Sequence, residues 1–208
     1  MRRFPLWPVA LLLAGCASLS PEQCVRADWR QIGFSDGAVG ASAARINDHA
    51  KACAEVGVRP DLDAYLRGRE QGLVNYCQPE NGFAVGRSGN LPNAGDCPEP
   101  MKPAFMDQYR DGYQVHVLET DLAQRRSHIY RNNQLIRRSN ERIHAIREEL
   151  AKSDLPDDRR KSLLNEFNRL VDQKNHLGRE NAFLVLEAER LQGYLDMRLR
   201  QGGRWRWQ

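Results

Sequence analysis

A seven-residue repeat of apolar side chains dominates the second half of this 208-residue chain. The repeat runs through two segments, separated by a short polar stretch. Apolar spacing of seven sustained over this many turns is typical of helices that pack along a narrow seam as a coiled coil. The repeated positions are Val115, Leu122, Ile129, Ile136, Ile143 and Leu150, followed by Leu163, Leu170, Leu177, Leu184 and Leu191.

The polar stretch between the two segments predicts a tight reversal of the chain. Residues 153–158 read Ser-Asp-Leu-Pro-Asp-Asp and combine a helix breaker with helix-start residues. Folding the chain back so that paired residue numbers add to 313 aligns both repeats and places the turn at Pro156-Asp157. We therefore predict an antiparallel helical hairpin over residues 103–201 with its turn near 151–162, each arm about 60 to 70 Å long.

Three layers of the predicted seam contain polar side chains. Asn132 faces Asn181, and we expect their amides to bond to each other. Ser139 faces Lys174, and Arg125 faces Ala188. We expect the two cations to reach water along their aliphatic stems. Such layers cost stability but penalise shifted registers, so register control is favoured over a binding role.

The N-terminus has the order of a secretory signal, with two arginines, an apolar run over residues 4–14, small residues and then Cys16. The run is too short to span a bilayer as a helix. Leu13-Ala14-Gly15-Cys16 resembles the bacterial lipobox, which implies cleavage after residue 15 and acylation of Cys16. Ala17 follows instead of aspartate, so the resemblance implies the outer membrane. The alternative is an ordinary cleaved signal with a chance cysteine.

The other four cysteines all lie in the first half of the chain. An even number of cysteines in an oxidising compartment predicts two disulfides. Three pairings are possible, and we favour Cys24–Cys53 and Cys77–Cys97, because antiparallel neighbouring helices would bring the first pair together. No C-x-x-C motif occurs and no histidine lies at ligand spacing, so a zinc site or a redox dithiol is disfavoured.

Residues 16–102 predict a small helical head. Asp28-Trp29 opens one helical pattern, Ser42 a second that stops at Gly57, and Pro60 a third through Tyr76. Glycines recur beside aromatic residues in these patterns, which favours close helix packing over a ligand groove. Residues 77–100 are rich in glycine and proline, so we predict a stapled surface loop and a candidate partner site there.

No motif in the chain demands catalysis, a metal or a cofactor. None of His49, His116, His128, His144 and His176 belongs to a metalloprotease pattern, and no G-x-S-x-G turn occurs. Asp28 and Asp36 lie two turns apart on one predicted helical face, but helix-start and surface roles are favoured over a carboxylate pair. Without Arg2 and Arg3 the formal charge falls from +4 to +2, which argues against nucleic-acid binding.

Candidate interaction residues lie in three places. Asp28, Trp29 and Asp36 belong to the first helical pattern, Arg87 belongs to the predicted loop, and the tail over residues 202–208 contains Arg204-Trp205-Arg206-Trp207. Alternating arginine and tryptophan suits an anionic membrane interface or an acidic groove. A tail without a partner is the alternative.

The head resembles a family of small bacterial lipoproteins that is classified only as a domain of unknown function. The resemblance covers roughly residues 16–115, leaves most of the hairpin outside, and implies no catalytic residue. Leu91 stands where the family pattern has an aromatic residue. The matching residues are Asp28-Trp29, Gly33, Asp36-Gly37, Gly40, Cys53, Tyr65, Gly68, Gly72-Leu73, Tyr76-Cys77, Asn81, Gly86, Gly89, Cys97, Tyr109 and Gly112.

These features together predict a mainly helical, outer-membrane-anchored lipoprotein that faces the periplasm. We expect a structural or adaptor role, in which the hairpin tip, near residues 152–161, meets an envelope protein or the cell wall. Hairpins of this kind also pair between subunits, so an oligomer is possible. The alternative is an envelope enzyme or small-ligand binder that uses the head.

Overall fold

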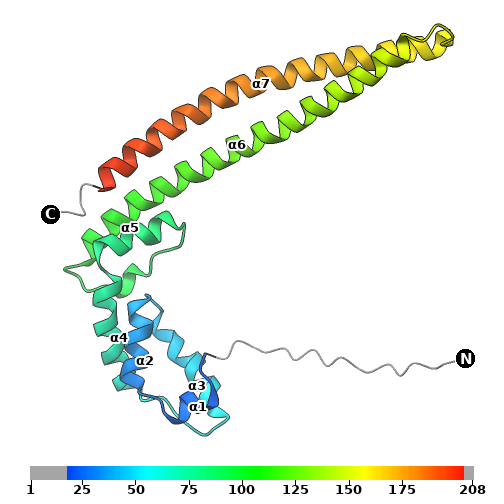
Figure 1. The fold of residues 1–208 in the computed structure, drawn as a ribbon. Coiled ribbons are helices and arrows are strands. Elements are labelled where there is room, and N and C mark those ends of the chain that lie inside the picture. The colour runs from blue at the N-terminus through cyan, green and yellow to red at the C-terminus, as the bar shows by residue number, and fades with distance from the viewer. Residues whose placement is uncertain (1–17, 204–208) are drawn as a thin grey trace, which may run out of the picture. The chain divides into compact units, whose positions relative to one another are not determined.

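The structure is a computed structural model that describes residues 18–203, and helices make up most of this range (Figure 1). The described residues contain no strand, in agreement with the predicted mainly helical class. The predicted lipidation site Cys16 and the tail residues Arg204, Trp205, Arg206 and Trp207 lie outside them. The helices are α1 (Pro21–Val25), α2 (Trp29–Ala38), η1 (Ala43–Arg45), α3 (Ile46–Ala54), α4 (Leu62–Tyr76), α5 (Pro79–Arg87), η2 (Ala94–Asp96), α6 (Lys102–Leu150) and α7 (Asp157–Gly203).

The chain divides into two compact units. The first contains residues 18–82 and 91–109, and the second contains residues 83–90 and 110–203. The predicted boundary at residue 102 therefore lies inside the first unit, because the first turns of α6 pack with the head. The division also runs through α5, whose last residues pack with the hairpin.

Two disulfides staple the first unit. Cys24 on α1 bonds to Cys53 on α3, with their Cα atoms 5.4 Å apart, and Cys77 bonds to Cys97, with their Cα atoms 5.7 Å apart. This is the pairing that the sequence favours. All four half-cystines are buried, so each bridge also contributes to the core.

Helices α2 and α4 pack unusually closely, as Figure 1 shows for the two ribbons. A Cβ atom at Gly33 would lie 2.0 Å from the Tyr65 carbonyl oxygen, and one at Gly68 would lie 1.8 Å from the Arg30 carbonyl oxygen. Each helix thus places a bare glycine against the backbone of the other. This confirms close helix packing at these glycines.

The predicted surface loop over residues 77–100 is wrong in part, because residues 79–87 form α5. Gly82, one of the glycines on which the loop prediction rests, is buried, and a Cβ there would lie 2.3 Å from the Phe105 carbonyl oxygen. Pro79 suits the first turn of a helix. Tertiary packing on α6 therefore overrides the breaker signal. Gly40 has a φ of +70° in the turn that follows α2.

Helices α6 and α7 run antiparallel as a hairpin, and the turn between them spans residues 151–156 (Figure 1). Val115, Leu122 and Leu195 form one buried cluster, with Leu118 and Leu191 packed against it. These contacts agree with the predicted layers of Leu118 with Leu195 and Leu122 with Leu191.

The central polar layer of the hairpin differs from the prediction. Asn132 is buried and donates from Nδ2 to the Glu180 carboxylate at 3.0 Å, while Asn181 donates from Nδ2 to the side-chain Oδ1 of Asn133 at 2.8 Å. The two amides therefore bond to Glu180 and Asn133 and not to each other. A carboxylate is the stronger acceptor for an amide donor, and Glu180 lies one residue away. Arg125 is half-buried and reaches Glu187 with its Nε at 3.1 Å.

Candidate functional site

A chain of polar side chains meets inside the first unit. Asp36, on the last turn of α2, lies 2.8 Å through Oδ2 from the Nε2 atom of His49 on α3. The hydroxyl of Tyr65 on α4 donates to the same Oδ2 atom, also at 2.8 Å. On the other side of the imidazole, Nδ1 lies 3.0 Å from the Ser18 hydroxyl. Arg45 adds a weaker ion pair, with Nε 3.7 Å from Asp36 Oδ1. We call these five residues the Asp36 cluster.

Local structure explains why these side chains converge. His49 and Cys53 are four residues apart and therefore share one face of α3. The disulfide from Cys53 to Cys24 fixes that face toward the core, so it also buries His49. Tyr65 is fully buried because Gly33 brings α2 onto its backbone, which aims its hydroxyl at Asp36.

The hydrogen bonds of the Asp36 cluster are mutually consistent for a neutral imidazole. Nε2–H donates to the carboxylate, which leaves Nδ1 to accept the hydroxyl proton of Ser18. Burial raises the pKa of Tyr65, and its hydrogen bond to the Asp36 carboxylate raises that pKa further. The phenol therefore stays protonated as a donor, and it holds the carboxylate in place.

The cluster attaches the start of the described chain to the head. Ser18 lies two residues after Cys16. Ser20 then forms a capping box with Gln23 at the start of α1. The chain thus enters the folded unit within a few residues of the predicted acylation site. Within residues 18–203, no group of three His, Cys, Asp or Glu side chains is placed to hold a metal ion.

A second buried polar group ties residues 91–97 to the turn after α2. Arg69 is buried, donates to the Ala41 carbonyl oxygen at 2.9 Å and pairs with Asp96. Asn93 donates from Nδ2 to the Gly40 carbonyl oxygen at 2.8 Å. These bonds satisfy backbone groups that the irregular segment would otherwise leave unpaired, which indicates a structural role.

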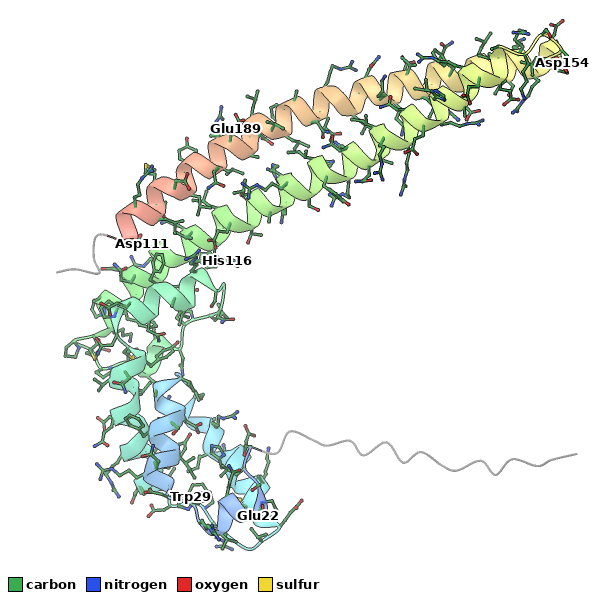
Figure 2. The ribbon with its side chains drawn as sticks, in the orientation of Figure 1. Glu22, Trp29, Asp111, His116, Asp154 and Glu189 are labelled. Carbon is green, nitrogen blue, oxygen red and sulfur yellow. A yellow bond between two sulfur atoms is a disulfide. The ribbon has the colours of Figure 1, made fainter. Side chains whose placement is uncertain are left out.

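The other predicted interaction residues have structural partners. Asp28 caps α2 by accepting from the Gln31 amide at 3.1 Å, and Trp29 is buried in the core beside the Cys24–Cys53 bridge (Figure 2). Asp28 and Asp36 begin and end the same helix about 12 Å apart, so they form no carboxylate pair. Arg87 donates to the Glu119 carboxylate from both Nε and Nη2.

The hairpin tip is polar and internally braced. Arg159 pairs with Glu149 across the turn at 2.8 Å, and Arg160 donates to the Leu150 carbonyl oxygen at 3.1 Å. Asp154 is exposed at the turn, where Figure 2 labels it. The tip is thus a fixed, charged surface.

Large apolar side chains are exposed farther down the hairpin. Tyr130 on α6 is 65% exposed, and on α7 Phe183 and Leu186 are 61% and 65% exposed. An open hollow of about 470 Å³ lies beside Leu186, and its lining includes Ile129, Ala182 and Val185. Isolated apolar residues on a surface are ordinary, whereas apolar residues that gather around a hollow indicate an interaction site.

Sequence reasoning proposed Asp36 but missed the convergence of Ser18, His49 and Tyr65 on it. The four-residue spacing of His49 from Cys53 was the available signal, because a disulfide fixes the inward face of its helix. Ser18 and Tyr65 come from other segments, and no spacing in the sequence relates them to Asp36. No helix in the described range is long and apolar enough to cross a membrane.

Comparison with known proteins finds one family model that is similar to part of the chain. No curated protein and no solved structure matches the chain. A family model, in contrast, matches a stretch that covers all of α2 to α5 and the start of α6. Most of the hairpin lies outside this stretch. Residues 28–114 match the family described as "Protein of unknown function (DUF2799)", which confirms the predicted resemblance to a domain of unknown function.

Proposed function

We propose that this protein is a lipoprotein anchored to the outer membrane through acylated Cys16, with its folded part in the periplasm. Four observations support the proposal: the lipobox-like Leu13-Ala14-Gly15-Cys16, the short apolar run before it, the two disulfides, and the attachment of Ser18 to the head by His49. Disulfides persist in oxidising compartments such as the periplasm, and two or more acyl chains give lasting membrane attachment.

The hairpin is the interaction element of this proposed lipoprotein, and the protein acts as a structural or adaptor component of the envelope. The observation that carries this role is the hairpin itself, two paired helices of about 70 Å each that end in a rigid charged turn. The seven-residue spacing of apolar side chains favours coiled-coil packing along the seam. A stiff element of this length suits the presentation of a surface to an envelope protein or the cell wall.

In-cell photo-crosslinking tests the adaptor role. A photoreactive residue replaces Asp154 at the turn in one strain and Lys51, exposed on α3, in a control strain. We expect position 154 to capture a defined envelope component that position 51 does not. We also expect deletion of residues 145–169 to abolish co-purification of that component with the protein. Equal crosslinked products at both positions, or co-purification of the component that survives the deletion, would contradict the role of the tip.

A second candidate function is an envelope enzyme or small-ligand binder at the Asp36 cluster. The observation that favours it is the Ser18 hydroxyl 3.0 Å from an imidazole nitrogen whose other nitrogen bonds to a carboxylate. Such a chain can draw the proton from a serine hydroxyl. A fluorophosphonate probe that labels the intact protein at Ser18, but not the His49→Gln variant, would support this candidate. Absence of labelling would remove it.

A further inference from the structure

One face of the hairpin near its middle is apolar and open. It contains Tyr130 and Asn133 on α6, and Ala182, Val185 and Leu186 on α7, and we call it the apolar face. Asn133, Ala182, Val185 and Leu186 line the hollow. Tyr130 lies three residues before Asn133 and therefore one turn from it on the same side of α6.

The opposite face of the hairpin is charged, and its own hollow of about 480 Å³ is lined by polar and charged side chains that include Arg125, His128 and Glu187. Its cross-hairpin ion pairs join Arg125 to Glu187 at 3.1 Å and His128 to Glu180 at 3.3 Å. Arg142 and Glu166 continue the row toward the turn at 2.8 Å. We call this the ionic face. The heptad positions explain why the two faces differ. His128, Glu180 and Glu187 flank one side of the seam, and Asn133 and Val185 flank the other.

Opposite charges flank the hollow on the two helices of the apolar face. Within residues 18–203, Arg126 on α6 donates only to the neutral amide of Gln192, at 3.0 Å. Glu189 on α7 lines the hollow, and it forms no ion pair among the described residues. In the hairpin register, where the numbers of facing residues add to 313, Arg126 lies opposite residue 187. Glu189 is two residues farther along α7, so the two side chains differ in height by about 3 Å along the hairpin axis. The two unused charges are therefore nearly level.

We propose that the apolar face binds the same face of a second copy of this chain, with the two hairpins parallel. In that arrangement α6 of each copy lies over α7 of the other, because the two-fold axis runs along the middle of the face. Arg126 of each copy then meets Glu189 of the other, at the same level on either side of the two-fold axis. Tyr130 and Leu186 become covered, and the two turns lie together.

The charges select the parallel arrangement over the antiparallel one. An antiparallel pair centred on the hollow places α6 over α6. Arg126 would then lie beside Arg137 of the second copy, and like charges at an interface suppress that pairing. The proposal goes beyond the adaptor role and holds whether or not Cys16 is acylated.

Sedimentation equilibrium of the full chain in density-matched detergent tests the proposal. We expect a monomer–dimer equilibrium. Leu186→Glu should raise the dimer dissociation constant about tenfold or more, because it places a charge at the centre of an apolar interface. Phe183→Glu is the matched control, since Phe183 is as exposed as Leu186 but lies on the ionic face. It should leave the constant unchanged.

A charge reversal tests the arrangement of the two copies. Arg126→Glu and Glu189→Arg should each weaken the dimer, and the double variant should restore it. Both residues are exposed, and circular dichroism of each variant establishes that the hairpin is intact. A chain that stays monomeric, an equal effect of Leu186→Glu and Phe183→Glu, or a double variant no better than the single ones would each overturn the proposal.

Discussion

At the residue scale, the absence of a side chain sets the distance between α2 and α4. Gly33, Gly37, Gly68 and Gly72 each leave no room for a Cβ atom against the backbone of the facing helix. Four glycines in helices cost up to about 1 kcal/mol each relative to alanine. The close packing that they permit offsets this cost, and it places Tyr65 against Asp36.

Gly68→Ala should destabilise the protein by about 1 to 3 kcal/mol, because the new methyl group overlaps the Arg30 carbonyl oxygen and the helices must separate. Gly193→Ala is the matched control, since a Cβ there meets nothing within 4 Å and alanine favours the helix. Urea denaturation monitored by circular dichroism measures both changes. Equal midpoints for the two variants would contradict the packing account.

Because the Tyr65 phenol is buried, we expect the unfolding free energy of the protein to fall at high pH. The pKa of this phenol in the folded protein is raised above the usual value of about 10, so the folded state holds the proton more tightly than the unfolded state. This contribution is fully present below pH 10 and is lost as the pH rises through the folded pKa. The unfolding free energy should therefore fall above about pH 10.

Tyr65→Phe should flatten this pH dependence, and it should also cost about 1 to 3 kcal/mol at neutral pH because a hydrogen bond to the Asp36 carboxylate is lost. Tyr194→Phe controls for the removal of an exposed hydroxyl. Denaturation series from pH 7 to about pH 11 provide the comparison. If the unfolding free energy of Tyr65→Phe fell with pH as steeply as that of the parent protein, another group would be the cause of the alkaline loss of stability.

At the element scale, periodic segments were predictable and irregular ones were not. The hairpin register followed from the heptads, because Leu122 and Leu191 recur at a spacing that only one fold-back aligns. The α5 helix was missed, because Gly82 reads as a breaker in the sequence and acts as a packing contact with Phe105 in the fold. The Asp36 cluster was only partly predictable, since long-range contacts bring its members together.

The Cys77–Cys97 bridge should stabilise the first unit but not the hairpin. It closes a separation of 20 residues, which corresponds to about 3 kcal/mol of restriction on the unfolded chain. Replacing both cysteines by alanine should lower the unfolding temperature reported by Trp29 fluorescence. The helical signal of α6 and α7 should melt as before. A matching shift in the hairpin transition would show that the two units unfold together.

At the scale of the whole molecule, one chain combines the proposed anchor, a stapled head and a long hairpin. The family match covers the head and only the start of the hairpin. The hairpin also carries the apolar face and the braced turn. Interaction specificity is therefore expected to reside in the hairpin, and attachment in the N-terminal segment.

The central claim is that the chain is tethered by a fatty-acylated Cys16, and the intact mass of the protein extracted from membranes tests it most directly. The account predicts a chain that begins at Cys16 and carries the mass of a diacylglyceryl group and an amide-linked acyl chain. Cys16→Ser should remove this modification and release the protein from the membrane fraction. A mature native protein in the soluble periplasm, without added lipid mass, would contradict the account.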